Sequence, residues 1–125
     1  SGRAIAQARR LIADFLEQSR PTAVFALHDR VAFEVYEVAA GLGLRVPEDL
    51  SLVGFDDATA VHAALPALTS VEQPRDRIGR VAAGLLVDRI EGRRQEVARH
   101  VLPTRLIVRG STAPAAEQRL ARPVA

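Results

Sequence analysis

The sequence predicts an α/β fold in which helices cover both faces of a largely parallel sheet, as a three-layer sandwich. Short apolar runs with the length of buried strands alternate with longer segments whose apolar residues recur at helical spacing. The turns between them are short and contain proline, glycine or aspartate. This alternation is typical of parallel sheets, because a crossover between two parallel strands usually runs through a helix. The length of 125 residues is enough for one domain with a buried core.

The first half of the chain contains two predicted helices and two predicted strands. Residues 3–18 have helical spacing, and a proline ends this helix before the apolar strand 22–27. Asp29 is in position to cap the next helix, which spans 29–41 and ends at glycines. A second apolar strand follows at 50–55. We expect these two strands to be adjacent and parallel.

The second half begins with a short predicted strand at 68–72. Residues 75–92 form the clearest helix, with one continuous apolar stripe that needs a covering partner. Apolar and polar side chains then alternate from 102 to 108, which predicts a strand with one covered face. Residues 113–125 show no apolar periodicity, and we expect them to form a mobile tail.

The helix at 29–41 is apolar on two faces. One stripe, which can face the sheet, consists of Val31, Val35, Val38 and Leu42. The other contains the only tyrosine of the chain and consists of Phe33, Tyr36 and Ala40. Either a second layer of the same chain or another subunit covers this second face.

The composition excludes several classes of protein. The chain has no cysteine, which rules out disulfides, thiolate zinc sites and a cysteine nucleophile. Its 17 basic residues are all arginine and are scattered among 15 acidic ones, so no nucleic-acid-binding face is indicated. The absence of cysteine fits a cytoplasmic protein. No apolar run approaches the ~18 residues that span a bilayer, so we expect no membrane contact. We find no phosphate loop and no catalytic constellation.

Two polar pairs follow the first two predicted strands directly: His28 with Asp29, and Asp56 with Asp57. Ligands gather at the carboxyl edge of parallel sheets, so three interpretations compete. Asp29 and Asp57 could be helix caps with a solvated His28, or the four groups could bind a small polar ligand such as a sugar. A magnesium or phosphoryl-transfer pocket is the weakest interpretation, because adjacent carboxylates diverge from an extended backbone and the chain has no lysine to hold a phosphate.

Several motifs resemble the lactose-repressor (LacI/GalR) family of bacterial transcription regulators, in unbroken order and spacing from about residue 1 to 114. They are "PTAVFALHD", "GLRVPEDLSLVGFDD", "LPALTSVEQP", "IGRVAAGLLVDRIEG" and "LPTRLIVRGST". The resemblance implies the effector-sensing domain of such a regulator, which has the two-lobed periplasmic-binding-protein fold. A run of consecutive motifs is a far more specific signal than any one of them.

The resemblance also implies how the chain is organised. Residues 1–112 correspond to the C-terminal part of the effector-binding and dimerisation domain. The segment 75–92 resembles the crossover into the N-terminal lobe, entered through a hinge at Gln73 and Pro74. Family members begin with a helix-turn-helix headpiece that nothing here matches. Operator DNA is therefore expected to bind only through that missing headpiece.

The family commonly has Asn-Asp where this chain has His28 and Asp29, and that asparagine contacts the effector. The departure indicates an altered ligand or a site that has lost its ligand. Asp56 matches an acid that often accepts sugar hydroxyls, and Gln73 matches a hinge glutamine near the cleft. Three residues match the surface that pairs subunits, which implies a homodimer: Phe33, Tyr36 and Leu65.

The sequence thus predicts a sensor that is not an enzyme and uses neither metal nor cofactor. A sugar or related metabolite is expected at His28, Asp56 and Gln73. One alternative with the same fold is a secreted solute-binding protein for transport, although such proteins are usually monomers. From a different class, a metal-dependent α/β enzyme stays open, and binding of Mg²⁺ would identify it.

Overall fold

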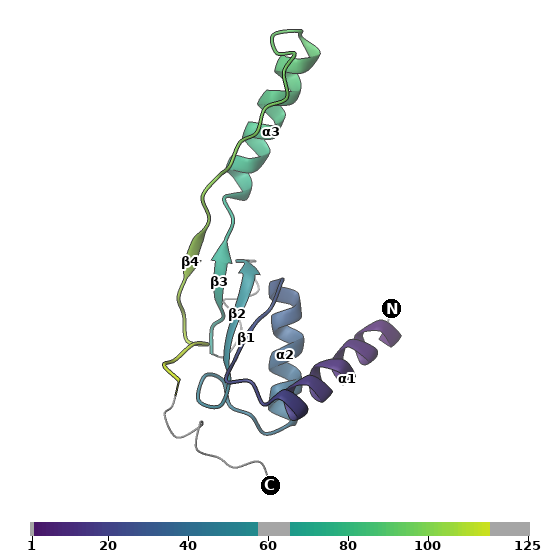
Figure 1. Ribbon diagram of the computed structural model, residues 1–125, viewed down its shortest axis with the longest axis vertical. Helices are drawn as coiled ribbons and strands as arrows, with labels where there is room; N and C mark the ends of the chain where they lie inside the picture. The colour runs from purple at the N-terminus through teal and green to yellow at the C-terminus, as the bar shows by residue number, and fades with distance from the viewer. Residues whose placement is uncertain (1, 58–65, 116–125) are drawn as a thin grey trace.

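A computed structural model describes residues 2–57 and 66–115 of the chain (Figure 1). Three helices and four strands follow one another in these residues. They are α1 (Gly2–Ser19), β1 (Ala23–Phe25), α2 (Asp29–Gly41), β2 (Ser51–Asp56), β3 (Thr69–Glu72), α3 (Arg75–Ile90) and β4 (Arg105–Ile107). None of these helices combines the length and the apolar character needed to cross a membrane.

The four strands form one sheet in the order β1-β2-β3-β4. β1 pairs with β2 and β2 with β3 in parallel, whereas β4 is antiparallel to β3 at the edge. The prediction that strands 22–27 and 50–55 are adjacent and parallel is therefore confirmed, as is the mixed α/β class. β1 and β4 are shorter than predicted, with three residues each.

The core lies between the sheet and α2, and α1 packs on α2 (Figure 1). Its fully buried leucines come from the sheet side: Leu50, Leu52 and Leu68. Each contributes about 1.5–3 kcal/mol through removal of its side chain from water. Leu16 of α1 is also buried.

The sheet-facing side of α2 differs from the predicted stripe. Val31 is exposed, and the buried residues are Asp29, Ala32, Val35 and Ala39. Val35 is buried and Val38 and Leu42 pack against the core, so only Val31 of the predicted stripe departs from it. The small alanines Ala32 and Ala39 complete the buried side of the helix.

The described helices cover only one face of the sheet. On the opposite face Phe25 is 63% exposed and meets Phe55 edge to face, with ring centroids 6.5 Å apart. The third layer of the predicted sandwich is therefore not among the described residues.

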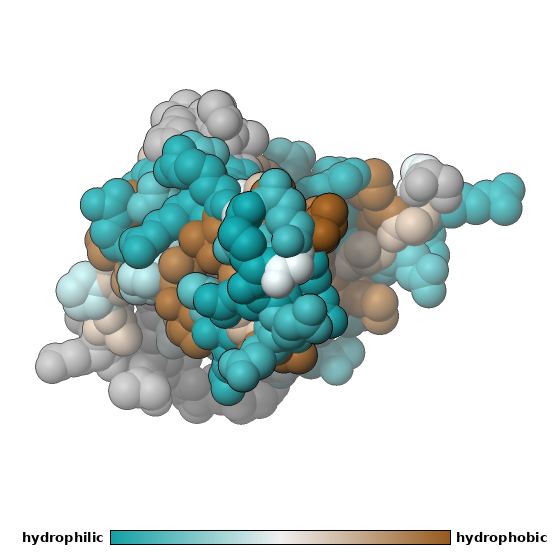
Figure 2. Space-filling view, turned by 90° about the horizontal axis from the view of Figure 1, so that it is seen from above, coloured by the Kyte–Doolittle hydropathy of each residue, from teal (hydrophilic) through white to brown (hydrophobic). Residues whose placement is uncertain are grey.

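α3 projects away from the sheet as an arm, and the chain returns alongside it to β4 (Figure 1). No α3 residue is buried, and Leu86, Val87 and Ile90 are exposed. Seen from above, the end of the molecule nearest the viewer is hydrophilic, and apolar residues are visible on several sides of it (Figure 2). The returning segment and α3 line an open groove between them, so the chain itself covers part of the predicted stripe.

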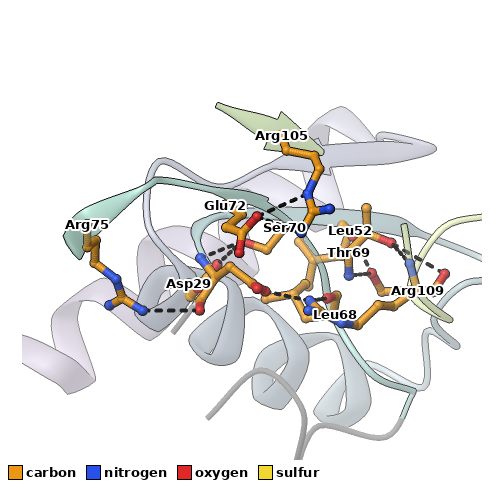
Figure 3. A network of polar contacts seen from close by, with 11 residues as sticks. Asp29, Leu52, Leu68, Thr69, Ser70, Glu72, Arg75, Arg105 and Arg109 are labelled. Atoms are coloured by element: carbon orange, nitrogen blue, oxygen red, sulfur yellow. Dashed lines mark hydrogen bonds and ion pairs between the residues drawn. The ribbon is translucent and has the colours of Figure 1, made fainter. Parts of the chain in front are cut away.

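Asp29 does not cap α2, contrary to the prediction. Its carboxylate points into the protein and accepts a 2.6 Å hydrogen bond from the buried Ser70 hydroxyl (Figure 3). Gly54 makes this approach possible, because a Cβ atom there would collide with the Asp29 carboxylate and lie 2.9 Å from Leu68 Cδ2. The N-cap of α2 is His28 instead.

The segment after β4 is tied to the sheet through Ser111, which is fully buried. Its hydroxyl donates to the Leu52 carbonyl at 2.6 Å and accepts from the Thr69 N–H at 2.7 Å. Ala113 exchanges two hydrogen bonds with the Ser51 hydroxyl, so the start of the predicted tail is attached to β2. Residues 116–125 lie outside the described residues.

We expect Gly54→Ala to lower the free energy of unfolding by about 1–3 kcal/mol, because its methyl group overpacks the contact with Asp29. Gly84→Ala is the matched control, since nothing lies within 4 Å of its Cβ position and alanine favours the helix. Urea denaturation of both variants tests this, and equal stability would contradict the close approach.

Ser111→Ala should lower the free energy of unfolding by about 1–3 kcal/mol, because the buried Thr69 N–H loses its acceptor. Ser51→Ala removes the same hydroxyl group at an exposed pair of hydrogen bonds and should change stability by less than about 0.5 kcal/mol. Thermal and urea unfolding followed by circular dichroism separate the two outcomes. A smaller loss for Ser111→Ala than for Ser51→Ala would refute the anchoring role.

Candidate functional site

Three side chains meet where three consecutive parallel strands end. His28 follows β1, Asp56 is the last residue of β2, and Gln73 follows β3. His28 Nε2 lies 2.8 Å from Asp56 Oδ2, and the Gln73 amide nitrogen donates a short hydrogen bond to Asp56 Oδ1. The predicted proximity of His28 and Asp56 is confirmed, and Gln73 joins them. We call these three residues the strand-end cluster.

The chain turns sharply at the end of β2. Asp56 has a φ of 101° and Asp57 a φ of 50°, and residues other than glycine rarely adopt positive φ values. Each such backbone conformation costs of order 1–3 kcal/mol of strain energy and persists where surrounding contacts fix it, which is often at functional sites. Here the turn sends the two neighbouring carboxylates to different partners.

Asp57 belongs to a structural ion pair rather than to the cluster. Its carboxylate lies 2.7 Å from an Arg109 nitrogen, and both side chains are only 13% exposed. The same nitrogen donates to the Leu68 carbonyl at 2.7 Å (Figure 3). The expectation that the adjacent carboxylates diverge is confirmed. Arg109 was not predicted, because a single arginine after an alternating strand carries no signal of a partner 52 residues away.

His28 has two different hydrogen-bonding partners. Its backbone is extended, and its Nδ1 atom accepts from the Arg30 N–H at 3.1 Å at the start of α2. Nε2, on the other side of the ring, faces Asp56. The interpretation of His28 as merely solvated is therefore wrong. The imidazole links the helix start to the strand-end cluster.

Two of the residues predicted to pair subunits, Phe33 and Tyr36, have partners other than the strand-end cluster. Phe33 and Tyr36 are half-buried against the core, and the Tyr36 hydroxyl donates to the Pro66 carbonyl at 2.7 Å. Burial raises the pKa of Tyr36. The same chain thus covers part of the second apolar face of α2. Leu65 lies outside the described residues.

The strand-end cluster is accessible and suited to hydroxyl groups. The His28 side chain is 54% exposed and the Asp56 side chain 21% exposed. A carboxylate has about four lone-pair sites, so Asp56 can accept further donors beside His28 and Gln73. Gln73 also lines the groove between α3 and the returning segment. Residues 2–57 and 66–115 contain no group of three or more side chains that could hold a metal ion.

Comparison with known proteins assigns the chain to a family. Residues 1–112 match the model of the periplasmic binding protein-like domain. The chain is 48% identical over 89 residues to the HTH-type transcriptional regulator CelR of Thermobifida fusca, covering 71% of the chain and 26% of CelR. It is 42% identical over 105 residues to the transcriptional repressor PurR of Escherichia coli O1:K1, covering 83% of the chain and 31% of PurR. The chain thus spans between a quarter and a third of these relatives.

Solved structures give the same result. The complex of the regulator CelR with cellobiose superposes with a TM-score of 0.80 at 41% identity, over 86% of this chain and 33% of that one. A LacI family regulator from Enterococcus faecium with bound ribose gives 0.78 at 36% identity, over 87% and 40%. The lac repressor dimer bound to operator gives 0.75 at 28% identity, over 84% and 37%. The chain belongs to the periplasmic-binding-protein-like family, in the group formed by the LacI-type transcription regulators.

Proposed function

We propose that this chain is the effector-sensing region of a LacI-type transcription regulator and binds a sugar or related neutral metabolite at the strand-end cluster. The observation that carries the proposal is the meeting of His28, Asp56 and Gln73 at the carboxyl ends of three parallel strands. Ligands of open α/β sheets bind at this edge. CelR and the Enterococcus faecium regulator, which share the fold, are known with cellobiose and with ribose respectively.

The position of Gln73 supports coupling between the ligand and the arm. Gln73 donates a hydrogen bond to Asp56 and directly precedes Pro74, the N-cap residue of α3. A ligand hydroxyl that competes for Asp56 changes the contact that holds this junction. We take α3 to be the crossover into a second lobe, so ligand binding would bias the angle between two lobes.

In the whole protein this region would control operator binding through a separate DNA-binding headpiece. The lac repressor, which shares the fold, is known as a dimer on its operator. Regulation of transcription would place the protein in the cytoplasm. No catalytic role is needed, because the cluster can recognise a ligand through hydrogen bonds alone. A solute-binding transport protein is a weaker candidate, since the relatives described above are transcription regulators.

Asp56→Asn in the whole gene product should weaken effector binding by roughly 10- to 150-fold. The variant loses a charged hydrogen bond, which contributes about 1.5–3 kcal/mol, while its size is kept. Titration calorimetry with cellobiose, ribose and a panel of related sugars and nucleosides measures the loss.

Asp14→Asn, an exposed change of the same kind on α1, is the matched control and should leave affinity unchanged. Unaltered affinity of Asp56→Asn for a ligand that the wild type binds would reject the cluster as the effector site. Failure of the wild type to bind any compound of the panel would reject the proposed ligand class.

We further propose that Phe33, Tyr36 and Leu65 contribute to a homodimer. Phe33→Glu should then shift the mass measured by light scattering from dimer to monomer, because a charge in an apolar interface is costly to desolvate. Arg30→Glu adds the same side chain elsewhere on α2 and should remain dimeric. Circular dichroism checks that both variants are folded. A Phe33→Glu variant that stays dimeric would place the interface elsewhere.

A further inference from the structure

The two ring nitrogens of His28 have fixed and different tasks. A backbone N–H can only donate, so Nδ1, which accepts from Arg30, must be without a proton. In the neutral ring the proton then resides on Nε2, which lies 2.8 Å from Asp56 Oδ2. This tautomer is the one whose hydrogen bonds satisfy both partners at once.

We infer that His28 is a specificity-determining residue, held by the start of α2 as a pure hydrogen-bond donor toward the ligand. The inference rests on the proposed function and names the ligand group that the site selects. Asp56 is an acceptor and His28 a donor at adjacent positions. A ligand hydroxyl that replaces the direct contact between Nε2 and Asp56 Oδ2 satisfies both groups, because it accepts from Nε2 and donates to the carboxylate.

Other ligand groups satisfy only half of this pair. An ammonium or amide N–H can donate to Asp56, but it cannot accept the hydrogen bond that His28 Nε2 donates. A carboxylate, phosphate or ether oxygen suits His28 but lies against the negative charge of Asp56. The pair therefore selects a neutral polyol over amines and acids. Discrimination against amines and acids is expected to be strong, because such a ligand leaves either His28 Nε2 or Asp56 without a hydrogen-bond partner.

The tautomer is tested without any ligand. Long-range ¹⁵N–¹H correlation spectra of the labelled chain at about pH 8, where a free imidazole is neutral, report which ring nitrogen carries the proton. The chain has three histidines, and His28→Asn identifies the His28 signals by their loss. We expect a protonated Nε2 and a bare Nδ1. A protonated Nδ1, or averaging between the two tautomers, would overturn the inference whatever the protein binds.

The specificity is tested with two variants that both keep the cap. Asparagine and aspartate are good N-cap residues, but only asparagine also has a donor. The probes are cellobiose and ribose, and analogues of whichever sugar binds, with each hydroxyl in turn replaced by hydrogen or by an amino group. For wild type and His28→Asn, we expect one position where both replacements lower affinity by roughly 10- to 150-fold.

In His28→Asp two carboxylates face that position, so the amino analogue should become the better ligand there. A structural role of the cap alone predicts no such reversal. An unchanged preference in His28→Asp would overturn the inference while leaving the proposed function intact. If the wild type binds neither cellobiose nor ribose, the proposed sugar ligand fails, and the spectra still decide the donor state of His28.

Discussion

The position of α2 on the sheet depends on one buried contact, the hydrogen bond from Ser70 to Asp29 above Gly54. A buried carboxylate is costly unless donors satisfy it, so this contact fixes where the helix begins. Gly54 supplies the space, and Ala32 and Ala39 continue the close packing along the helix. His28 precedes Asp29 directly. The contact inside the protein therefore also sets the location of the imidazole at its edge.

Ser70 connects both sides of the strand-end cluster. Its hydroxyl donates to Asp29 and accepts from the Asp57 N–H at 3.2 Å. The first bond positions the start of α2 with His28, and the second positions the turn that carries Asp56. Arg109 supports the same turn through Asp57 and ties it to the Leu68 carbonyl. The cluster is thus accessible, whereas Asp29 and Ser70, which fix its geometry, are buried, and Asp57 and Arg109 are nearly so. Supporting contacts of this kind hold the exposed side chains in place.

The sequence allowed most of the fold to be predicted, because helical periodicity and apolar runs are local signals. The helices at 29–41 and 75–92 were predicted to within two residues, and the first two strands were paired correctly. His28 and Asp56 could be brought together because strand ends share an edge. Gln73 depended on the family resemblance alone. Asp29 was wrongly predicted to be the N-cap of α2. The preference of aspartate for N-cap positions is a local signal, whereas the space for its buried carboxylate comes from Gly54, 25 residues further along the chain.

The polar contacts missed by sequence reasoning are long-range ones. Ser111 bonds to Leu52 across 59 residues, and Ser70 bonds to Asp29 across 41. Serines and single arginines are common on surfaces, so nothing in the local pattern separates a buried anchor from a solvated side chain. Only the folded arrangement gives such a residue its partner.

The family resemblance implies an asparagine where this chain has His28, and a histidine there is consistent with these constraints. A residue at this position must accept the Arg30 N–H and also donate toward Asp56. Serine and threonine can cap the helix, but their hydroxyls are short, and aspartate has no donor. Asparagine and the neutral histidine each combine an acceptor with a donor on one planar group. Histidine carries its donor further from the backbone, so in the site that we propose the change keeps the hydrogen-bonding pattern and moves the donor outward. Under that proposal the departure fits an altered ligand shape rather than a lost site.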